Sequence, residues 1–463
     1  MDLCLVQPRH VYAPDPSIRR IGHVYMPTSL LTAASRLLQA GVRLQVVDEN
    51  VFECEILADV VAINLIGAPY IRKGVEFSRR LERWNPKGKL ILGGQVVSGF
   101  REEEFRKLFG SSAVNGNDDR QLAIALGINS SALPPPESVS LIGAYELLKD
   151  NVMQLYLSNE FGFYLSQGCQ YTCSFCAAKR TRCDPNTGKM IPVKEVYRDI
   201  ITVEKDLRYL VKKSLRYGLN EMKIYLSNLD LFQTPRDLRR FAAVVQSIRR
   251  DFPDFTIKMR GLSNVNSFLK VRENDPDLIH DLASAGLKRI GFGVDGATED
   301  IWRAVRKPHG SYSCIDAISV SVEYGLTPET LMVFGHEGVD NEESLQLACD
   351  LVKAMWDKYG SLPRPHVSKS VIPGNDGWYD PNKRHLIDIF LGNPELFQVL
   401  DFTALPSVLT HLEPAFRDMV KRHYLQVCKM SGTVTQYVLP EEPGLTTDEL
   451  MRVRSFNEER YDV

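Results

Sequence analysis

The sequence predicts an α/β fold made of two consecutive series of strand–helix units. Short apolar runs alternate with segments whose apolar residues recur at helical spacing, first near the N-terminus and again from about residue 160. A proline-rich stretch separates the two series. Strands that alternate with helices usually pair in parallel, so we expect a doubly wound N-terminal sheet followed by a partial parallel barrel.

The N-terminal series predicts a small open sheet over residues 1–128. Its strands are continuous apolar runs, of the kind that is buried on both faces of a parallel sheet. We expect strands at 3–8, 42–48, 58–65 and 89–94, a further short strand at 112–114, and helices at 27–41 and 70–84.

Residues 129–155 are predicted to link the two series. They include Ser130 to Ser140, where three consecutive prolines cannot continue a helix or a sheet. This linker is expected to end shortly before the first strand of the second series.

The second series, over residues 156–376, predicts six strand–helix units. Its helices include 193–215, entered through Pro192, and 277–285, which ends before Gly286. In parallel barrels, chemistry gathers on the loops that follow the carboxyl ends of the strands. We expect strands at 161–167, 222–228, 255–260, 288–294, 329–334 and 366–372, and a small, mostly helical C-terminal region at 377–463.

The composition is that of an ordinary soluble protein. The 463 residues are 44% hydrophobic and 25% charged, with a formal net charge of −2, which gives no electrostatic reason to expect a nucleic acid or an acidic membrane as partner. The first residues lack the basic and apolar regions of a signal peptide, and no apolar run approaches the ~20 residues that cross a bilayer. We therefore expect a cytoplasmic protein with reduced cysteines, and no nucleic-acid or membrane partner.

Three of the nine cysteines lie within eight positions, in the segment SQGCQYTCSFC that follows the first predicted barrel strand. Cys169, Cys173 and Cys176 are separated by three and two residues. With cysteine at roughly 2% of positions, chance would produce this fixed pattern in well under ~1% of chains of this length. Three thiolates on a [4Fe–4S] cluster leave one iron without a protein ligand, and an open metal position is typical of catalytic sites.

Two other metal sites remain open from the cysteine pattern alone. A zinc site could recruit Cys183 as fourth ligand, although structural zinc usually uses two separated pairs of cysteine or histidine. A ferredoxin-type cluster also needs a fourth cysteine, but Cys183, followed by Asp184 and Pro185, stands at the wrong distance for its usual run. Either site would make the chain a non-enzymatic metal protein.

The segment CQYTCSFC resembles the C-x3-C-x2-C signature of the radical S-adenosylmethionine (SAM) superfamily, including the aromatic Phe175 before the last cysteine. The resemblance implies that Cys169, Cys173 and Cys176 hold a [4Fe–4S] cluster whose open iron binds SAM. It also implies reductive cleavage of SAM to a 5′-deoxyadenosyl radical, a small-molecule substrate, and an electron donor such as flavodoxin or ferredoxin. The protein would bind, orient and exclude water, since the cofactor carries the hard chemistry.

The resemblance extends over most of residues 160–375. IYLSNLDLF resembles the second-strand segment that helps to bind the SAM amino group, although it is polar where an acidic motif is often found. IKMRGLSNV resembles the third-strand motif, whose alternate basic residues share one face and would suit the SAM carboxylate. GFGVDG, together with Lys307 further along the chain, resembles the fourth-strand segment. LMVFGHEG and VIPGND resemble the fifth- and sixth-strand segments. The implied cofactor contacts are Phe175, Ser227, Asn228, Lys258, Arg260, Asp295, Lys307 and Gly335.

A doubly wound domain before such a barrel resembles the branch of the superfamily with an N-terminal Rossmann-like, cobalamin-binding domain. LLQAGVRLQVVD, ADVVAINL and ILGGQ carry this resemblance. The Asp-x-His-x-x-Gly motif that supplies a histidine to cobalt is missing, because the loop after ADVVAINL reads IGAPYIRKG and His10 and His23 lie elsewhere. The resemblance therefore leaves cobalamin open as a cofactor without favouring it.

Within this branch, a compact chain with a degenerate cobalamin domain looks most like the radical SAM diol dehydratases of aminoglycoside antibiotic biosynthesis, of the apramycin-pathway type. This resemblance implies loss of water from a 1,2-diol of an aminosugar and a partner reductase that finishes the product. The alternative that stays open is a cobalamin-dependent methyltransferase acting on a natural product. Dehydration needs a base, an acid and acidic groups for the sugar ammoniums, and the candidates near strand ends are Tyr225, Asp230, His336 and Glu337.

Overall fold

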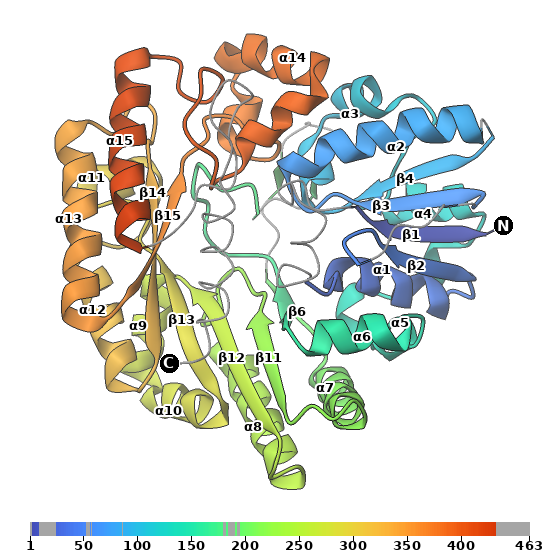
Figure 1. The fold of residues 1–463 in the computed structure, drawn as a ribbon, viewed down its shortest axis with the longest axis horizontal. Helices are drawn as coiled ribbons and strands as arrows, with labels where there is room; N and C mark the ends of the chain where they lie inside the picture. The colour runs from blue at the N-terminus through green and yellow to red at the C-terminus, as the bar shows by residue number, and fades with distance from the viewer. Residues whose placement is uncertain are drawn as a thin grey trace.

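The fold consists of two parallel sheets whose carboxyl ends face the middle of the molecule (Figure 1). This is a computed structural model, and it describes residues 2–8, 25–51, 56, 58–85, 87–178, 182–183, 190–191 and 195–431. One sheet has five strands and the other six, and the second curls into an open half-barrel. The predicted α/β class, with its doubly wound domain, partial barrel and helical C-terminal region, is confirmed.

The N-terminal sheet has the strand order β2-β1-β3-β4-β5, with every neighbouring pair parallel. The order reverses between β1 and β3, which is where doubly wound sheets bind ligands. The five predicted strands are confirmed with small shifts of their ends. The elements are β1 (Leu3–Gln7), α1 (Thr28–Gln39), β2 (Leu44–Asp48), β3 (Val60–Asn64), η2 (Ala68–Tyr70), α2 (Ile71–Trp84), β4 (Lys89–Gly93), η3 (Gln95–Gly99), α3 (Glu102–Phe109), β5 (Val114–Asn115) and α4 (Asp119–Leu126).

The segment predicted as a linker is packed rather than extended into solvent. Tyr145, Met153 and Tyr156 are each at most 1% exposed and join one hydrophobic core that runs from the N-terminal helix α1 into the barrel. The Tyr156 hydroxyl donates to the Asp48 carboxylate at 2.5 Å, which fastens this segment to the end of β2. Its elements are η4 (Ser130–Ala132), η5 (Pro136–Ser138), α5 (Ile142–Tyr145) and α6 (Asp150–Leu157).

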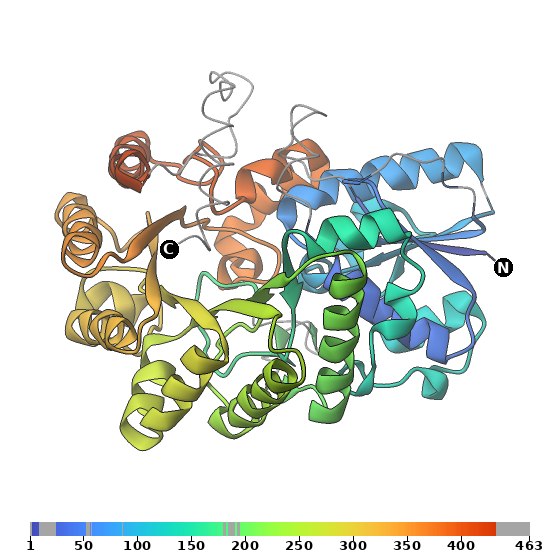
Figure 2. The ribbon, with the colours of Figure 1, turned by 60° about the horizontal axis from the view of Figure 1, so that its bottom comes forward.

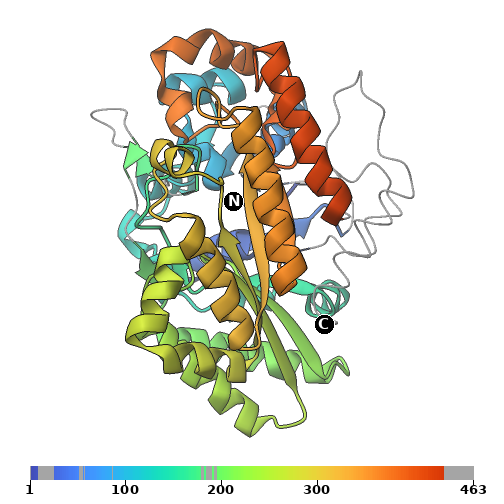
Figure 3. The same cartoon turned by 90° about the vertical axis from the view of Figure 1, so that its left-hand side faces the viewer.

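The second sheet has the order β15-β14-β13-β12-β11-β6, so successive parallel strands are neighbours and the sheet does not close. Its helices cover the outer, convex face (Figures 2 and 3). The strands are β6 (Glu160–Phe163), β11 (Glu221–Leu226), β12 (Thr256–Ser263), β13 (Leu287–Gly293), β14 (Thr327–Phe334) and β15 (Leu362–Val367); the helices are α7 (Ile200–Arg216), α8 (Pro235–Asp251), α9 (Val265–Asn274), α10 (Pro276–Ala285), α11 (Glu299–Ala304), α12 (Ser311–Glu323) and α13 (Glu342–Tyr359).

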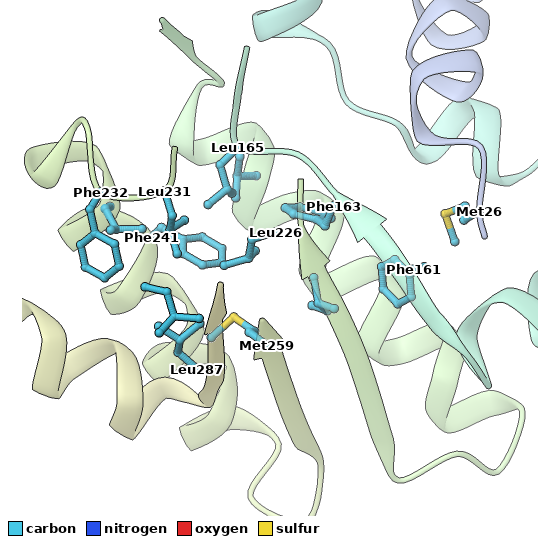
Figure 4. Packing of buried hydrophobic residues seen from close by; sticks show 14 of the residues in the cluster. Met26, Phe161, Phe163, Leu165, Leu226, Leu231, Phe232, Phe241, Met259 and Leu287 are labelled. Atoms are coloured by element: carbon cyan, nitrogen blue, oxygen red, sulfur yellow. The ribbon is translucent and has the colours of Figure 1, made fainter. Parts of the chain in front are cut away.

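Alternate strand residues separate an apolar outer layer from a polar inner one. Phe163 of β6, Leu226 of β11 and Met259 of β12 are buried on the side of the sheet where Phe241 of α8 lies, and the buried Phe161 of β6 lies nearer to Met26 (Figure 4). The residues between them on the same strands point to the concave side, as the period of two along a strand requires. The concave side is therefore where this sheet can place polar groups.

Two predicted boundaries are wrong. The last barrel strand covers Leu362–Val367 instead of 366–372; it is an edge strand, where Pro363 and Pro365 need not donate to a neighbour. The helix predicted from residue 193 begins at Ile200, because the Asp199 carboxylate caps it by accepting from the Thr202 amide at 2.9 Å. Shortly before it, β10 (Val196–Tyr197) pairs with β7 (Ser166–Gln167), and β8 (Arg182–Cys183) pairs with β9 (Met190–Ile191).

The first part of the C-terminal region packs against the N-terminal domain, and α15 (Pro414–Ser431) packs against β15 and α13 of the barrel. Trp378 and Phe397 are fully buried and contact Phe100, at ring-centroid distances of 5.6 and 6.1 Å. The described helices include none that is long and apolar enough to cross a membrane. The elements of this region are η6 (Asp376–Tyr379), η7 (Pro381–Lys383), α14 (Arg384–Gly392), η8 (Pro394–Leu400) and α15 (Pro414–Ser431).

Candidate active site at the cysteine loop

The loop that carries the three cysteines follows β7, at the carboxyl ends of the barrel strands. The Gln170 amide donates to the side chain of Gln233, in the loop between β11 and α8, at 3.0 Å. The Ser174 amide donates to the Val305 carbonyl after α11, and the Ser174 carbonyl accepts from the Asp376 amide, each at 3.2 Å. The loop is thus fastened to three different segments, which fixes its backbone before any cofactor binds.

The three cysteines are thiols close to one another. Cys173 is buried, and Cys169 and Cys176 are half-buried. The pKa of Cys169 is raised to about 12, mainly by burial, with Asp230, Cys176 and Cys173 acting in the same direction. In the part of the chain that the structure describes, no three His, Cys, Asp or Glu residues converge as ligands for a single metal ion.

This donor set fits a [4Fe–4S] cluster better than a single ion. Each thiolate of such a cluster binds a different iron, so three donors need not meet at one point. Only thiolates bind iron, so binding of the cluster would release the protons of the three thiols. The side chain of Cys183, the alternative fourth ligand, lies outside the described residues.

Asp295 and Lys307 form an ion pair beside the cysteines. The Lys307 ammonium lies 2.5 Å from the Asp295 carboxylate and donates to the Gly293 carbonyl at 3.2 Å. Burial alone would lower the pKa of Lys307, but Asp295 and the thiols of Cys173 and Cys176 raise it above its usual value overall. Asp295 has a φ of 56°, a left-handed backbone that is uncommon outside glycine and concentrates at functional sites.

Phe175 and His336 connect the cysteine loop to the end of β14. Their ring centroids are 5.3 Å apart, and the His336 Nε2 lies 2.9 Å from the Asp295 carbonyl oxygen. The adjacent Gly335 has a φ of 85°, and a Cβ there would lie 2.7 Å from the His411 Nε2. A larger residue at Gly335 would therefore clash with His411 and strain the backbone at this strand end.

Asp230 lies at the rim of the same loop, buried and held by neutral donors. Its carboxylate accepts from the Ser263 hydroxyl at 3.0 Å, the Asn264 amide at 3.1 Å and the Ser267 hydroxyl at 2.6 Å. Burial raises its pKa, although these hydrogen bonds act in the opposite direction. These hydrogen bonds join the loop after β11 to the end of β12 and the start of α9. The charge of Asp230 also raises the pKa of Cys169.

Ser227 and Asn228 anchor the start of the cysteine segment. The Ser227 amide donates to the Phe163 carbonyl at 3.1 Å, and the Asn228 amide group donates to the Ser166 hydroxyl at 2.7 Å. The Ser166 hydroxyl in turn donates to the Glu195 carboxylate. The sequence offered no sign of the roles of Glu195 and Gln233, since both are polar residues in loops and their contacts depend on tertiary placement.

Four of the predicted site residues have partners away from the cysteine loop. Lys258 pairs with Glu221 at 2.8 Å, and Arg260 pairs with Glu160 at 2.6 Å while lying 4.2 Å from the Tyr225 ring centroid. The exposed Glu337 pairs with Lys383 at 3.0 Å. Lys258, Arg260 and Tyr225 lie on the concave face before the strands end, so their assignment to SAM or to catalysis stays a prediction, as does that of Glu337.

Residues 163–348 match the model of the family described as the Radical SAM superfamily. The match includes the cysteine loop, the Asp295–Lys307 pair and strands β11 to β14. This segment is a radical SAM domain. No curated protein matches the chain in sequence.

Two solved structures resemble the chain over more than this domain. The radical SAM methyltransferase TsrM from Kitasatospora setae, solved with cobalamin and a [4Fe-4S] cluster, is 13% identical, with a TM-score of 0.58 over 81% of this chain and 76% of that one. The cobalamin-dependent SAM radical enzyme OxsB, solved with aqua-cobalamin and SAM, is 14% identical, with a TM-score of 0.58 over 86% of this chain and 56% of that one. At these identities the likeness establishes the fold.

The carboxyl edge of the N-terminal sheet carries one exposed apolar side chain and a closely packed glycine. Ile66, one residue past Leu65 at the end of β3, is 46% exposed. Gly94 after β4 has a φ of 102°, and a Cβ there would lie 2.4 Å from the Leu65 carbonyl oxygen, so the two loops meet closely. Ile66 follows β3, next to the topological switch point between β1 and β3, and an exposed apolar side chain there fits a cobalamin bound without a histidine ligand. His10 and His23 lie outside the described residues.

Proposed function

We propose that the chain is a radical SAM enzyme that acts on a small molecule. The observation that carries the proposal is the cysteine loop, in which Cys169, Cys173 and Cys176 are held beside the Asp295–Lys307 pair by three separate segments. When bound, the cluster and SAM supply a 5′-deoxyadenosyl radical that takes hydrogen from the substrate. An electron donor such as flavodoxin or ferredoxin would reduce the cluster.

The chain's own residues would hold and orient these groups. Cys169, Cys173 and Cys176 bind the cluster through their sulfurs. The Lys307 ammonium neutralises negative charge next to two of those sulfurs, since it stays protonated at neutral pH. Phe175 and His336 close the side of the site at the end of β14 and exclude water there.

We infer cobalamin-dependent methyl transfer as the reaction class. TsrM and OxsB are cobalamin enzymes, TsrM is a methyltransferase, and the likeness to both covers more of the chain than the radical SAM domain. The exposed Ile66 and the glycine backbone of the β4 loop support a place for the corrin. When bound, cobalamin would carry the methyl group, while the N-terminal domain positions it opposite the cysteine loop.

Dehydration of a diol is the second candidate, and the missing histidine in the loop after β3 favours it. The groups available for proton transfer near the cysteine loop are Asp230 and His336, both buried. The buried and uncharged surroundings of Asp230 raise its pKa, which suits a carboxyl that exchanges a proton. A partner reductase would complete the product.

Anaerobic reconstitution with iron and sulfide tests the proposal. The wild-type protein should bind an iron–sulfur cluster and form 5′-deoxyadenosine from SAM and dithionite. Cys169→Ala, Cys173→Ala and Cys176→Ala should each abolish that product, whereas Cys349→Ala, which changes a buried cysteine far from the loop in sequence, should keep it. Binding of zinc without iron would contradict the proposal.

The reaction class is decided by cofactor and product mass. A cob(II)alamin absorption after addition of cobalamin, with products heavier by one methylene unit, would support methyl transfer. Products lighter by one water and formed without cobalamin would support dehydration. Aminoglycoside precursors and tryptophan, the substrate bound to TsrM, are the first substrates to test.

A further inference from the structure

Lys369 is a fully buried lysine at the carboxyl end of the last barrel strand. It lies two residues after β15, and the neighbouring Ser368 amide donates to the Phe334 carbonyl at the end of β14 at 2.8 Å. The Lys369 carbonyl accepts from the Asn375 side chain at 3.2 Å, which fixes the backbone at this point. Lys369 is 1% exposed, so its ammonium has left bulk water.

None of the described carboxylates forms an ion pair with Lys369. Its ammonium donates to the carbonyl of Ala404 at 2.8 Å and more weakly to that of Leu405 at 3.5 Å. Asp401 exerts an attraction, but its carboxylate accepts from the Thr403 amide at 2.7 Å. A buried ammonium without a paired anion is costly, so this position gains from an anion that arrives with a ligand.

The neighbours of Lys369 belong to the same end of the barrel as the cysteine loop. Besides burial, the charges of Lys369 and His336 both lower the pKa of His411. The His411 Nε2 lies 3.2 Å from the Gly335 carbonyl oxygen. Asp295 and Asp401 both lie near enough to His366 on β15 for their charges to act on its pKa. His336 packs against Phe175 of the cysteine loop, His411 contacts the Gly335 backbone beside His336, and Lys369 lies near enough to His411 for its charge to lower the pKa of that ring.

The titratable neighbours do not supply the missing anion. Burial lowers the pKa of His411 to about 3, and it also lowers the pKa of His366, so both rings are neutral at pH 7. Burial likewise lowers the pKa of Lys369 to about 7, with Asp401 acting in the opposite direction. Near neutral pH the amine is therefore balanced between its charged and uncharged forms.

We propose that Lys369 binds an acidic group of the substrate, a carboxylate or a phosphate, at the β14–β15 end of the barrel. This rests on the proposed function, because the same end of the barrel holds the cysteine loop. An anion placed at Lys369 would satisfy its third N–H donor and leave the rest of the substrate directed toward His336 and Phe175. The substrate class is thus an acidic small molecule.

Calorimetry with acetate or inorganic phosphate, on the reconstituted enzyme with SAM, tests this site. At about pH 7.5 most Lys369 is neutral, and an anion favours the ammonium, so binding should take up protons and its heat should depend on the ionisation enthalpy of the buffer. Lys369→Met should weaken binding by about tenfold or more. Lys369→Arg should keep binding but lose the proton uptake, since arginine is always charged.

The control is Lys353→Met, which removes an exposed lysine of α13 that pairs with Asp357, and it should leave anion binding unchanged. Preference for acetate would identify a carboxylate, and preference for phosphate a phosphoryl group. Equal binding by wild type and Lys369→Met, binding without proton uptake, or no binding of either anion would overturn the site. Failure of the proposed function would show separately, as absence of 5′-deoxyadenosine from the wild type.

Discussion

At Lys307, a single ammonium faces the Asp295 carboxylate and the sulfurs of Cys173 and Cys176. Reduction of a cluster bound there would add one negative charge next to this cation. The cation therefore stabilises the reduced form, and its loss should make the cluster harder to reduce.

We predict that Lys307→Met lowers the midpoint potential of the reconstituted cluster. A tenfold shift in the one-electron equilibrium corresponds to about 59 mV, and we expect a change of about that size. A redox titration followed by electron paramagnetic resonance measures it. Lys307→Arg keeps the charge and should stay near wild type, as should Lys288→Met on the exposed side of β13. A potential that is the same in Lys307→Met would show that the ammonium does not act on the cluster.

At this scale, residues close in sequence to a motif could be predicted, and partners from distant segments could not. Asp295 and Lys307 lie beside the cysteine loop, which itself contains Phe175, while the roles of all three toward SAM stay a prediction. Arg260 was expected at SAM, but its partner Glu160 comes from another strand, and the pairing depends on a register that no local pattern reveals. The sequence pattern gives no sign of a site at Lys369, because this residue falls within the predicted strand 366–372.

At the scale of elements, the Arg260–Glu160 pair holds β12 to β6 across the concave face. Arg260 is bound by both carboxylate oxygens, at 2.6 and 2.8 Å, and also lies over Tyr225 of the intervening β11. Both partners are largely buried. Removal of one partner from a buried pair leaves an uncompensated charge, which costs more than the pair itself contributes.

We therefore predict that Arg260→Met lowers the free energy of unfolding by about 3 kcal/mol. The double variant Arg260→Met/Glu160→Gln should recover part of the loss, because the second change removes the stranded charge. Chemical denaturation of wild type, Arg260→Met, Glu160→Gln and the double variant measures the coupling. The exposed pair Arg303–Asp300 supplies the control, and Arg303→Met should change stability by less than about 0.5 kcal/mol. Equal losses in the single and double variants would contradict this account.

Element boundaries show what the sequence pattern can and cannot fix. The positions and parallel type of the strands in both large sheets followed from apolar runs, since buried parallel strands need them. The bounds of β15 could not be predicted in this way. Its outer edge tolerates Pro363 and Pro365, and the more apolar run that follows it forms a loop that packs on the N-terminal domain. An edge position is a property of the whole sheet and is invisible locally.

At the scale of the molecule, the N-terminal domain supports the cysteine loop through the C-terminal region. Gly99 at the end of η3 is so close to the loop after β15 that a Cβ there would lie 2.3 Å from the Pro373 carbonyl carbon, and the Tyr379 hydroxyl donates to the Gly99 carbonyl at 2.6 Å. On the other side of this loop, a Cβ at Gly374 would lie 3.4 Å from that of Ala177. The loop after β15 therefore contacts the N-terminal domain on one side and the cysteine loop on the other.

Glu104 of α3 is the polar centre of this interface. Its carboxylate is 1% exposed and accepts from the Trp378 indole at 3.0 Å, from the Arg384 guanidinium at 2.8 Å and from the Arg101 amide at 3.0 Å. Without it, the buried Trp378 indole N–H would lose its acceptor, and the Arg384 guanidinium would keep only Asp388, among the described residues, as a hydrogen-bond partner. The cost of such a loss is on the order of 3 kcal/mol.

We predict that Glu104→Ala loosens the contact between the N-terminal domain and the C-terminal region before global unfolding. Amide hydrogen exchange should accelerate in 95–100 and 373–379, and the effect should reach 174–177 because the loop after β15 contacts both. The neighbouring Glu103 is 73% exposed and lies 4.0 Å from the same Arg384, so Glu103→Ala is the matched control and should exchange like wild type. If exchange in 174–177 stayed at the wild-type rate while 95–100 accelerated, the cysteine loop would owe its rigidity to Gln233 and Val305 within the barrel, and the N-terminal domain would serve ligand binding alone.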